Sequence, residues 1–145
     1  MNIIRRYWRI ALPIIIMIII WIFSSINGVT SEANSLAVAS FFGIPNFVIR
    51  KLAHVLLFGL LGFTWAVYMK HRYIDIFPST GSLVFAVILV LCYGIIDELH
   101  QYYVPGREAL PIDVLLDTVS GLGGAFLYTA IFSFRYRNRL LKRKK

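Results

Sequence analysis

Cysteine and acidic side chains are scarce in this sequence. Cys92 is the single cysteine, which excludes an intrachain disulfide framework and a metal site built on cysteine pairs. Seven Asp and Glu stand against fifteen Lys and Arg, for a formal net charge of +8. This excess does not favour nucleic-acid binding, because the basic residues lie at the ends of apolar runs and not along one polar face. We therefore expect no nucleic-acid partner.

Apolar residues are abundant: 59% of the chain is hydrophobic and 15% is aromatic. A helix needs about 20 mainly apolar residues to cross the hydrocarbon core of a bilayer, and several segments meet that length. The sequence therefore predicts an all-α, polytopic membrane protein, with about four transmembrane helices in a small bundle and a single domain over residues 1–145. The predicted spans are residues 7–26, 47–69, 83–104 and 112–134.

Basic residues flank these spans unevenly. Those near the span ends cluster on one side: Arg5, Arg6, Arg9, Lys70, Arg72 and the basic tail of residues 135–145. Cytoplasmic flanks are enriched in Lys and Arg, so we predict cytoplasmic N- and C-termini and a multi-pass protein of the plasma membrane. A signal peptide is the alternative for the first segment, but its long apolar stretch and interfacial Trp8 and Trp21 favour a retained span.

The predicted outer connection, residues 27–46, changes character along its length. Its first half is Ser-rich, and its second half is apolar and contains Gly43 and Pro45. Two interpretations remain open. The apolar part forms a short interfacial or re-entrant helix that ends at Gly43, or the whole connection is an ordinary surface loop.

Ionisable residues inside spans are energetically costly, so they commonly mark function. Here they occupy the predicted outer halves of three spans, together with the polar Gln101: Lys51, His54, Asp97, Glu98, His100, Asp113 and Asp117. Three helices therefore bring polar groups to one depth, and we predict an outward-facing polar site within the membrane. Arg107 follows in the next connection, and its planar guanidinium suits a phosphate or a carboxylate.

Helical periodicity places the polar residues of each span on one face. The three faces carry Lys51, His54 and Phe58; Asp97 and Gln101; and Asp113, Asp117 and Gly121. If these faces meet, Lys51 neutralises Asp97 or Asp113, and His54 supplies a group that titrates near neutral pH. For any single residue, an interhelical pair that only holds the bundle together is the simpler interpretation. We assign Ser120, Gly121, Gly123 and Gly124 to helix packing.

Sequence motifs for metal binding and for a serine nucleophile are missing. There is no HExxH motif, and His100 and Glu98 point to different faces of one helix. Neither Ser25 nor Ser120 has an activating motif around it. We therefore predict no metal site and no cofactor.

Three sequence blocks resemble the VanZ-like family in their order and spacing. They are KLAHVLLFGLLG from Lys51, DELHQYYVPGR from Asp97 and PIDVLLDTVSGLGG from Pro111, and the resemblance covers roughly residues 46–134. The family pattern carries over to Lys51, His54, Asp97, Glu98, Gln101, Arg107, Asp113 and Gly121. Asp117 departs from it, because the pattern has asparagine there, so this chain adds a negative charge.

The resemblance implies a small bacterial membrane protein, and the namesake of the family is associated with low-level resistance to teicoplanin without vancomycin resistance. We expect a role in the cell envelope and in teicoplanin resistance, with the bilayer and an envelope lipid or lipid-linked precursor as partners. An enzyme acting on such head groups is the alternative. Its candidate catalytic residues are Glu98, His54 and Asp97, and its binding residues are Lys51, Gln101, Arg107, Asp113 and Asp117.

Two further hypotheses are a proton pathway and a non-catalytic helper of another membrane protein. The apolar cytoplasmic halves of the spans argue against the pathway, because a relay needs polar groups across the whole membrane.

Overall fold

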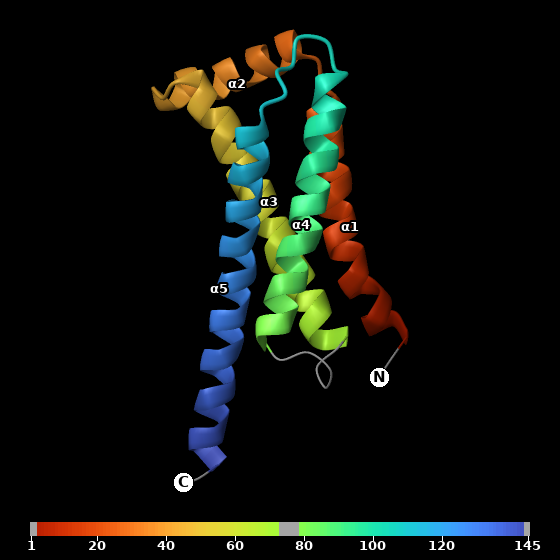
Figure 1. Ribbon diagram of the computed structural model, residues 1–145. Helices are drawn as coiled ribbons and strands as arrows, with labels where there is room; N and C mark the ends of the chain where they lie inside the picture. Colours follow the sequence, from red (N-terminus) through yellow and green to blue (C-terminus); the bar gives the residue numbers. More distant parts are fainter. Residues whose placement is uncertain (1–2, 73–78, 144–145) are drawn as a thin grey trace.

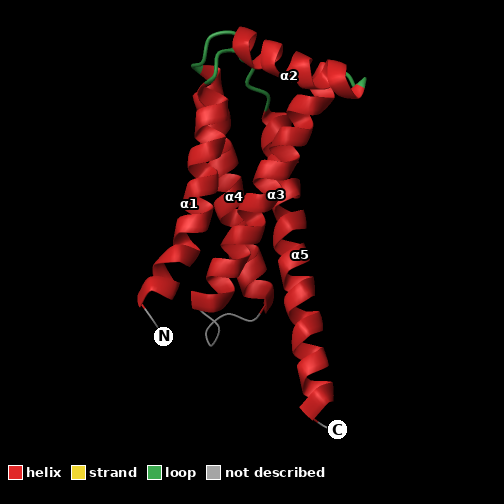
Figure 2. Ribbon diagram, turned by 180° about the vertical axis from the view of Figure 1, so that it is seen from behind, coloured by secondary structure: helices red, strands yellow, loops and turns green. Residues whose placement is uncertain are grey.

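The computed structural model describes residues 3–72 and 79–143, and these residues form five helices (Figure 1). The helices are α1 (Ile3–Ser25), α2 (Gly28–Phe42), α3 (Asn46–Arg72), α4 (Ser79–Tyr102) and α5 (Pro111–Arg143). Four of them run along one bundle, and α2 lies across one end of it (Figure 2). Both chain termini lie at the opposite end. We call these the α2 end and the terminal end.

Among the described residues, four helices are long and apolar enough to cross a bilayer. These spans are Tyr7–Ser25, Asn46–Met69, Gly81–Tyr102 and Pro111–Phe132, which confirms the predicted number and places each boundary within a few residues of the prediction. Only 17% to 39% of each span is buried inside the bundle. The remaining surface is rich in Ile, Leu, Val and Phe side chains. Such a surface belongs in lipid, as in a multi-pass membrane protein.

The last helix is longer than the predicted span. We expected the span to end at residue 134, but α5 continues to Arg143. Arg, Leu and Lys are strong helix formers, so the basic tail extends the helix beyond its apolar part. Residues 144–145 of that tail lie outside the described residues.

The connection between the first two spans is a helix, so the surface-loop interpretation is wrong. The Asn27 side chain accepts a hydrogen bond from the backbone N–H of Thr30 at 2.8 Å, which caps α2 at its start. Gly43 ends it in the left-handed conformation at φ 64°. The helix begins earlier than the apolar half because this cap lies in the Ser-rich half. Since α2 crosses the end of the bundle, its position favours an interfacial over a re-entrant helix.

Glycines bring α3 and α5 into close contact. A Cβ atom at Gly62 would overlap the carbonyl group of Gly121, and a Cβ atom at Gly124 would overlap that of Gly59. Small residues allow such close approach between membrane helices. Gly123 is different, because a Cβ atom there would have nothing within 4 Å. Its assignment to helix packing is therefore wrong: a side chain at Gly123 would point into open space, whereas one at Gly124 would point at α3.

Apolar side chains fill the bundle below its α2 end. One cluster of buried residues joins α1, α3 and α4: Ile16, Ile20, Phe58, Leu61, Val90 and Tyr93. A second consists of Ala66, Ala86 and Ala125, with Trp65, Leu83 and Tyr128 packed against it. The polar side chains inside the bundle thus lie mainly at its α2 end.

Candidate functional site

One ion pair and one hydrogen bond join α3 to α5 near the α2 end. Lys51 Nζ contacts Asp113 Oδ1, and His54 Nδ1 lies 3.2 Å from Asp117 Oδ1. Both helices start at the α2 end and run in the same direction. Paired residues therefore follow the same order along the two helices. Asp113 is placed by the first turn of α5, which begins at Pro111, a favoured first residue of a helix. Of the two partners open to Lys51, the structure therefore pairs it with Asp113.

The third polar face belongs to α4. Gln101 Nε2 donates to Asp97 Oδ2 at 2.8 Å and to Ser24 Oγ of α1 at 3.5 Å. Asp97 is fully buried, and Gln101 is 4% exposed. Glu98 is also buried and accepts a hydrogen bond from the backbone N–H of Leu110, just ahead of α5. The predicted stripe of Asp97 and Gln101 thus faces the centre, and Glu98 anchors the connection to α5.

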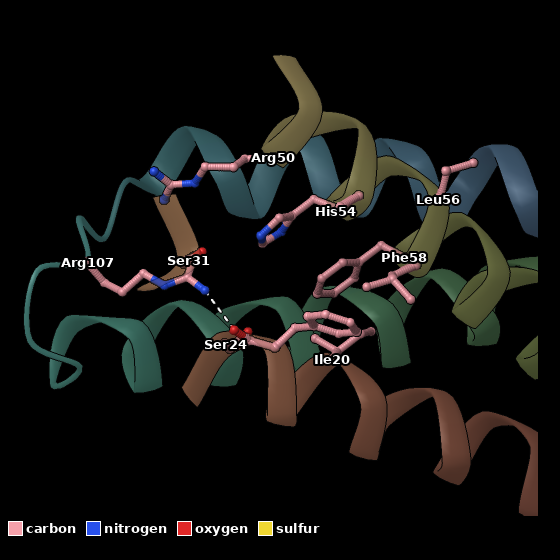
Figure 3. A pocket seen from close by; sticks show the side chains of 11 residues that line it. Ile20, Ser24, Ser31, Arg50, His54, Leu56, Phe58 and Arg107 are labelled. Atoms are coloured by element: carbon pink, nitrogen blue, oxygen red, sulfur yellow. Dashed lines mark hydrogen bonds between the residues drawn. The ribbon is translucent and has the colours of Figure 1, made fainter. Parts of the chain in front are cut away.

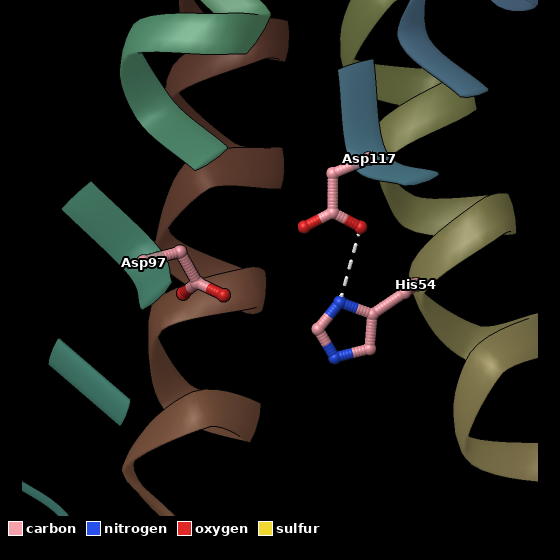
Figure 4. Close-up of side chains that lie close together, drawn as sticks. All are labelled: His54, Asp97 and Asp117. Atoms are coloured by element: carbon pink, nitrogen blue, oxygen red, sulfur yellow. Dashed lines mark hydrogen bonds and ion pairs between the residues drawn. The ribbon is translucent and has the colours of Figure 1, made fainter. Parts of the chain in front are cut away.

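Three residues from three helices converge on one point (Figure 4). His54, Asp97 and Asp117 each offer a possible ligand atom, and these atoms lie within 4.8 Å of one another. Asp97 Oδ1 and Asp117 Oδ2 are buried without a hydrogen-bond partner. The sequence predicted no metal site because a motif search detects ligands at short spacing, whereas these ligands come together only through helix packing. They could hold a divalent cation.

His100 does not join this cluster. Its ring stacks on Trp21 of α1 with a centroid distance of 3.9 Å, and its Nε2 lies 2.9 Å from Ser25 Oγ. One position along a helix rotates a side chain by about 100°, so His100 points to α1 while Gln101 points to the centre.

Arg107 fastens the connection between α4 and α5 onto α1. Its Nη2 donates to the Phe23 carbonyl at 2.7 Å and its Nε to the Ile26 carbonyl at 3.2 Å. The Phe23 carbonyl belongs to the last turn of α1 and the Ile26 carbonyl directly follows that helix, where carbonyl groups lack the usual i+4 helical donors. Burial lowers the pKa of the Arg107 guanidinium, and the nearby Arg50 cation lowers it further. Arg107 has five N–H donors, so it retains donors for an anion beside Arg50.

A cavity of about 330 Å³ adjoins this pair of arginines. Figure 3 shows part of its lining from the polar to the apolar end: Arg107, Arg50, His54, Ile20, Phe58 and Leu56. A smaller cavity of about 180 Å³ shares Arg50, His54 and Arg107 with it and extends to Lys51 and Asp113. One side of the site is therefore cationic, and the other is apolar.

Arg50 and Ser24 are site residues that the sequence analysis did not assign. The spacing of four between Arg50 and His54 indicates a shared helix face. Ser24 lies in the first span, which has no ionisable residue nearby to draw attention to it, and only packing brings it to Gln101.

Comparison with known proteins gives one match. The VanZ/LLP1 family model matches residues 9–133, from the first span to the end of the fourth. Neither the curated proteins nor the solved structures contain a match to this chain.

Proposed function

This chain belongs to the VanZ/LLP1 family, and from that premise we propose that it binds the anionic head group of a cell-envelope amphiphile at the α2 end of its bundle. The ligand would be a lipid or a lipid-linked precursor. Its head would lie between Arg50 and Arg107, and its chain would follow the apolar wall of the cavity.

The cavity is the observation that supports this proposal most directly. Arg50 and Arg107 line one end of it, and Ile20 and Phe58 line the other. Guanidinium groups bind phosphate and carboxylate oxygens through paired hydrogen bonds. The repulsion between two neighbouring arginines falls when an anion lies between them. An amphiphile with an anionic head matches both ends of the cavity.

The charge pattern supports an outward-facing cavity. The basic tail extends α5 at the terminal end, and we infer that this end is cytoplasmic because positive flanks stay inside. The α2 end then faces outward in the plasma membrane. Envelope precursors and the targets of glycopeptides are found on that side, so binding there offers a route to teicoplanin resistance, as the family resemblance implies.

An enzyme acting on the same head group is a second candidate. His54 lines the cavity and is hydrogen-bonded to Asp117, an arrangement that orients an imidazole as a general base. In the candidate enzyme, His54 or Glu98 acts as the general acid or base, and Asp97 orients the reacting groups. An unchanged inventory of lipids and precursors after deletion of the gene would contradict catalysis and leave binding alone. A proton pathway has less support, since Phe58, Leu61 and Val90 pack closely below the site.

Replacing Arg50 with glutamine should weaken the binding of an anionic amphiphile. A lost hydrogen bond to a charged group costs about 1.5–3 kcal/mol, so we expect affinity to fall by roughly tenfold or more. The probe is dioctanoyl phosphatidic acid, titrated into the purified chain in zwitterionic nanodiscs. Arg50 is preferable to Arg107 because Arg107 also donates hydrogen bonds to two carbonyl groups at and just after the end of α1.

Arg9→Gln is the matched control for this experiment. It removes the same charge from α1 near the terminal end, outside the residues that line the two cavities. We expect it to bind phosphatidic acid like the original chain, and dioctanoyl phosphatidylcholine to bind weakly to all three proteins. Equal affinity for the two lipids, or equal loss in both variants, would contradict a head-group site at Arg50.

A further inference from the structure

The meeting of His54, Asp97 and Asp117 has consequences beyond lipid binding. Their ligand atoms lie within 4.8 Å of one another, and His54 Nδ1 is 3.2 Å from Asp117 Oδ1. Around an ion with bonds of about 2 Å, ligand atoms lie at most about 4 Å apart. Small side-chain movements would therefore bring all three atoms into one coordination sphere. We propose that these residues bind a divalent transition-metal ion such as Zn²⁺ or Mn²⁺.

Two unpartnered carboxylate oxygens independently point to a ligand at this position. Asp97 Oδ1 and Asp117 Oδ2 make no hydrogen bond, and both side chains belong to fully buried residues. Figure 4 shows both carboxylates turned toward the space beside the His54 ring. A buried polar atom without a partner destabilises the folded chain, and more so when it is charged. A bound cation would provide the missing partner for both oxygens.

The carboxylates of Asp97 and Asp117 together need two positive charges to neutralise them. Among the described residues, no Lys or Arg forms an ion pair with Asp97 or Asp117, and Lys51 is paired with Asp113. Two buried carboxylates beside a neutral imidazole carry a charge of −2, which is costly in a low-dielectric interior. One divalent cation neutralises both. For Nδ1 of this neutral imidazole to bind the ion, its single ring proton would lie on Nε2.

The donor atoms select the class of metal. One imidazole nitrogen with two carboxylate oxygens suits Zn²⁺, Mn²⁺ or Fe²⁺, whereas Mg²⁺ and Ca²⁺ prefer oxygen ligands alone. Gln101 acts as an outer-shell partner, because its donation to Asp97 Oδ2 leaves Oδ1 directed to the ion. His54 also lines the cavity, so further coordination positions can take water or a head-group oxygen.

Metal binding by the purified chain tests this proposal. The chain in zwitterionic nanodiscs, without anionic amphiphile, is stripped with a chelator, titrated with Zn²⁺ or Mn²⁺ and assayed for bound metal. We expect one ion per chain and a rise in unfolding temperature that grows with metal concentration. Asp117→Asn keeps the shape and the acceptor oxygen but removes the charge. It should weaken binding at least about tenfold, the smallest loss typical even of outer-shell changes.

Glu32→Gln is the matched control, since it neutralises an exposed acid on α2. It should retain one ion per chain. Arg50→Gln should also retain the ion, which separates this proposal from the head-group site: each can fail while the other holds. His54→Gln is the second variant if Asp117→Asn does not fold.

Cobalt provides a readout that does not depend on stability. Co²⁺ in the original chain should give visible absorption bands of nitrogen and oxygen ligation, and these bands should be lost in Asp117→Asn. Equal metal content in the original chain, Asp117→Asn and His54→Gln, with no metal-dependent rise in unfolding temperature, would overturn the proposal. The cluster would then be neutralised by protons.

Discussion

Replacing Gly124 with alanine is expected to prevent α3 and α5 from packing at their present separation. The new Cβ atom would overlap the carbonyl group of Gly59, and a helix backbone cannot move aside as a flexible side chain can. Overpacking of this kind costs about 1–3 kcal/mol or more, and here it acts where the backbones of two spans lie close together. We expect the unfolding temperature of the purified chain in detergent to fall strongly. The pairs Lys51–Asp113 and His54–Asp117 should be disturbed as well, because they bridge the same two helices.

Gly123→Ala makes the same chemical change one position earlier and serves as the control. Nothing lies within 4 Å of a Cβ atom at Gly123. Alanine is a better helix former than glycine by about 1 kcal/mol, so this variant should be as stable as the original chain or slightly more stable. Similar stability of the two variants would mean that α3 and α5 are not in the close contact described above.

Expression of the chain in a Gram-positive host is expected to lower susceptibility to teicoplanin and leave susceptibility to vancomycin unchanged. Glu98→Gln should abolish this protection if the chain acts as an enzyme in which Glu98 transfers a proton. Glutamine retains the oxygen that accepts the hydrogen bond from the Leu110 backbone, so the connection to α5 stays in place while the buried negative charge is lost. Inhibitory concentrations of both drugs are measured at matched membrane abundance, with Glu32→Gln as a control for the loss of an acidic group.

The comparison with an empty vector tests whether the chain lowers susceptibility to teicoplanin. No difference between the vector and the original chain would separate this protein from the resistance phenotype. Protection that persists in Glu98→Gln would instead show that the Glu98 charge is not required and would direct attention to Arg50 and Arg107.

The two cavities and the carboxylate cluster form two regions of different charge at the α2 end. Arg50 and Arg107 lie on the cationic side, and Asp97 and Asp117 lie deeper, next to the apolar core. His54 contacts both regions, because it lines the cavities and is hydrogen-bonded to Asp117. If both proposals hold, an anionic head group and a metal ion meet at this residue. Their opposite charges would strengthen the binding of each other.

The sequence was sufficient to predict the four spans, the polar faces of three of them and the family. Hydropathy over about 20 residues is a local property, and it persists whatever the neighbouring helices are. Helical periodicity likewise places Lys51 with His54, and Asp97 with Gln101, without knowledge of the bundle. Apolar runs did not predict the basic extension of α5 or the start of α2, because both segments are rich in polar residues.

Helix packing in the folded bundle sets which residues meet. The sequence left Lys51 with two possible partners, grouped Gly123 with the packing glycines and predicted no metal site. The rotation and neighbours of each helix depend on contacts such as Gly59 with Gly124, which join segments far apart in the chain. Those contacts place Asp113 beside Lys51 and bring His54, Asp97 and Asp117 to one point. Local pattern cannot predict this, because it sets which face of a helix is polar but not which helix that face meets.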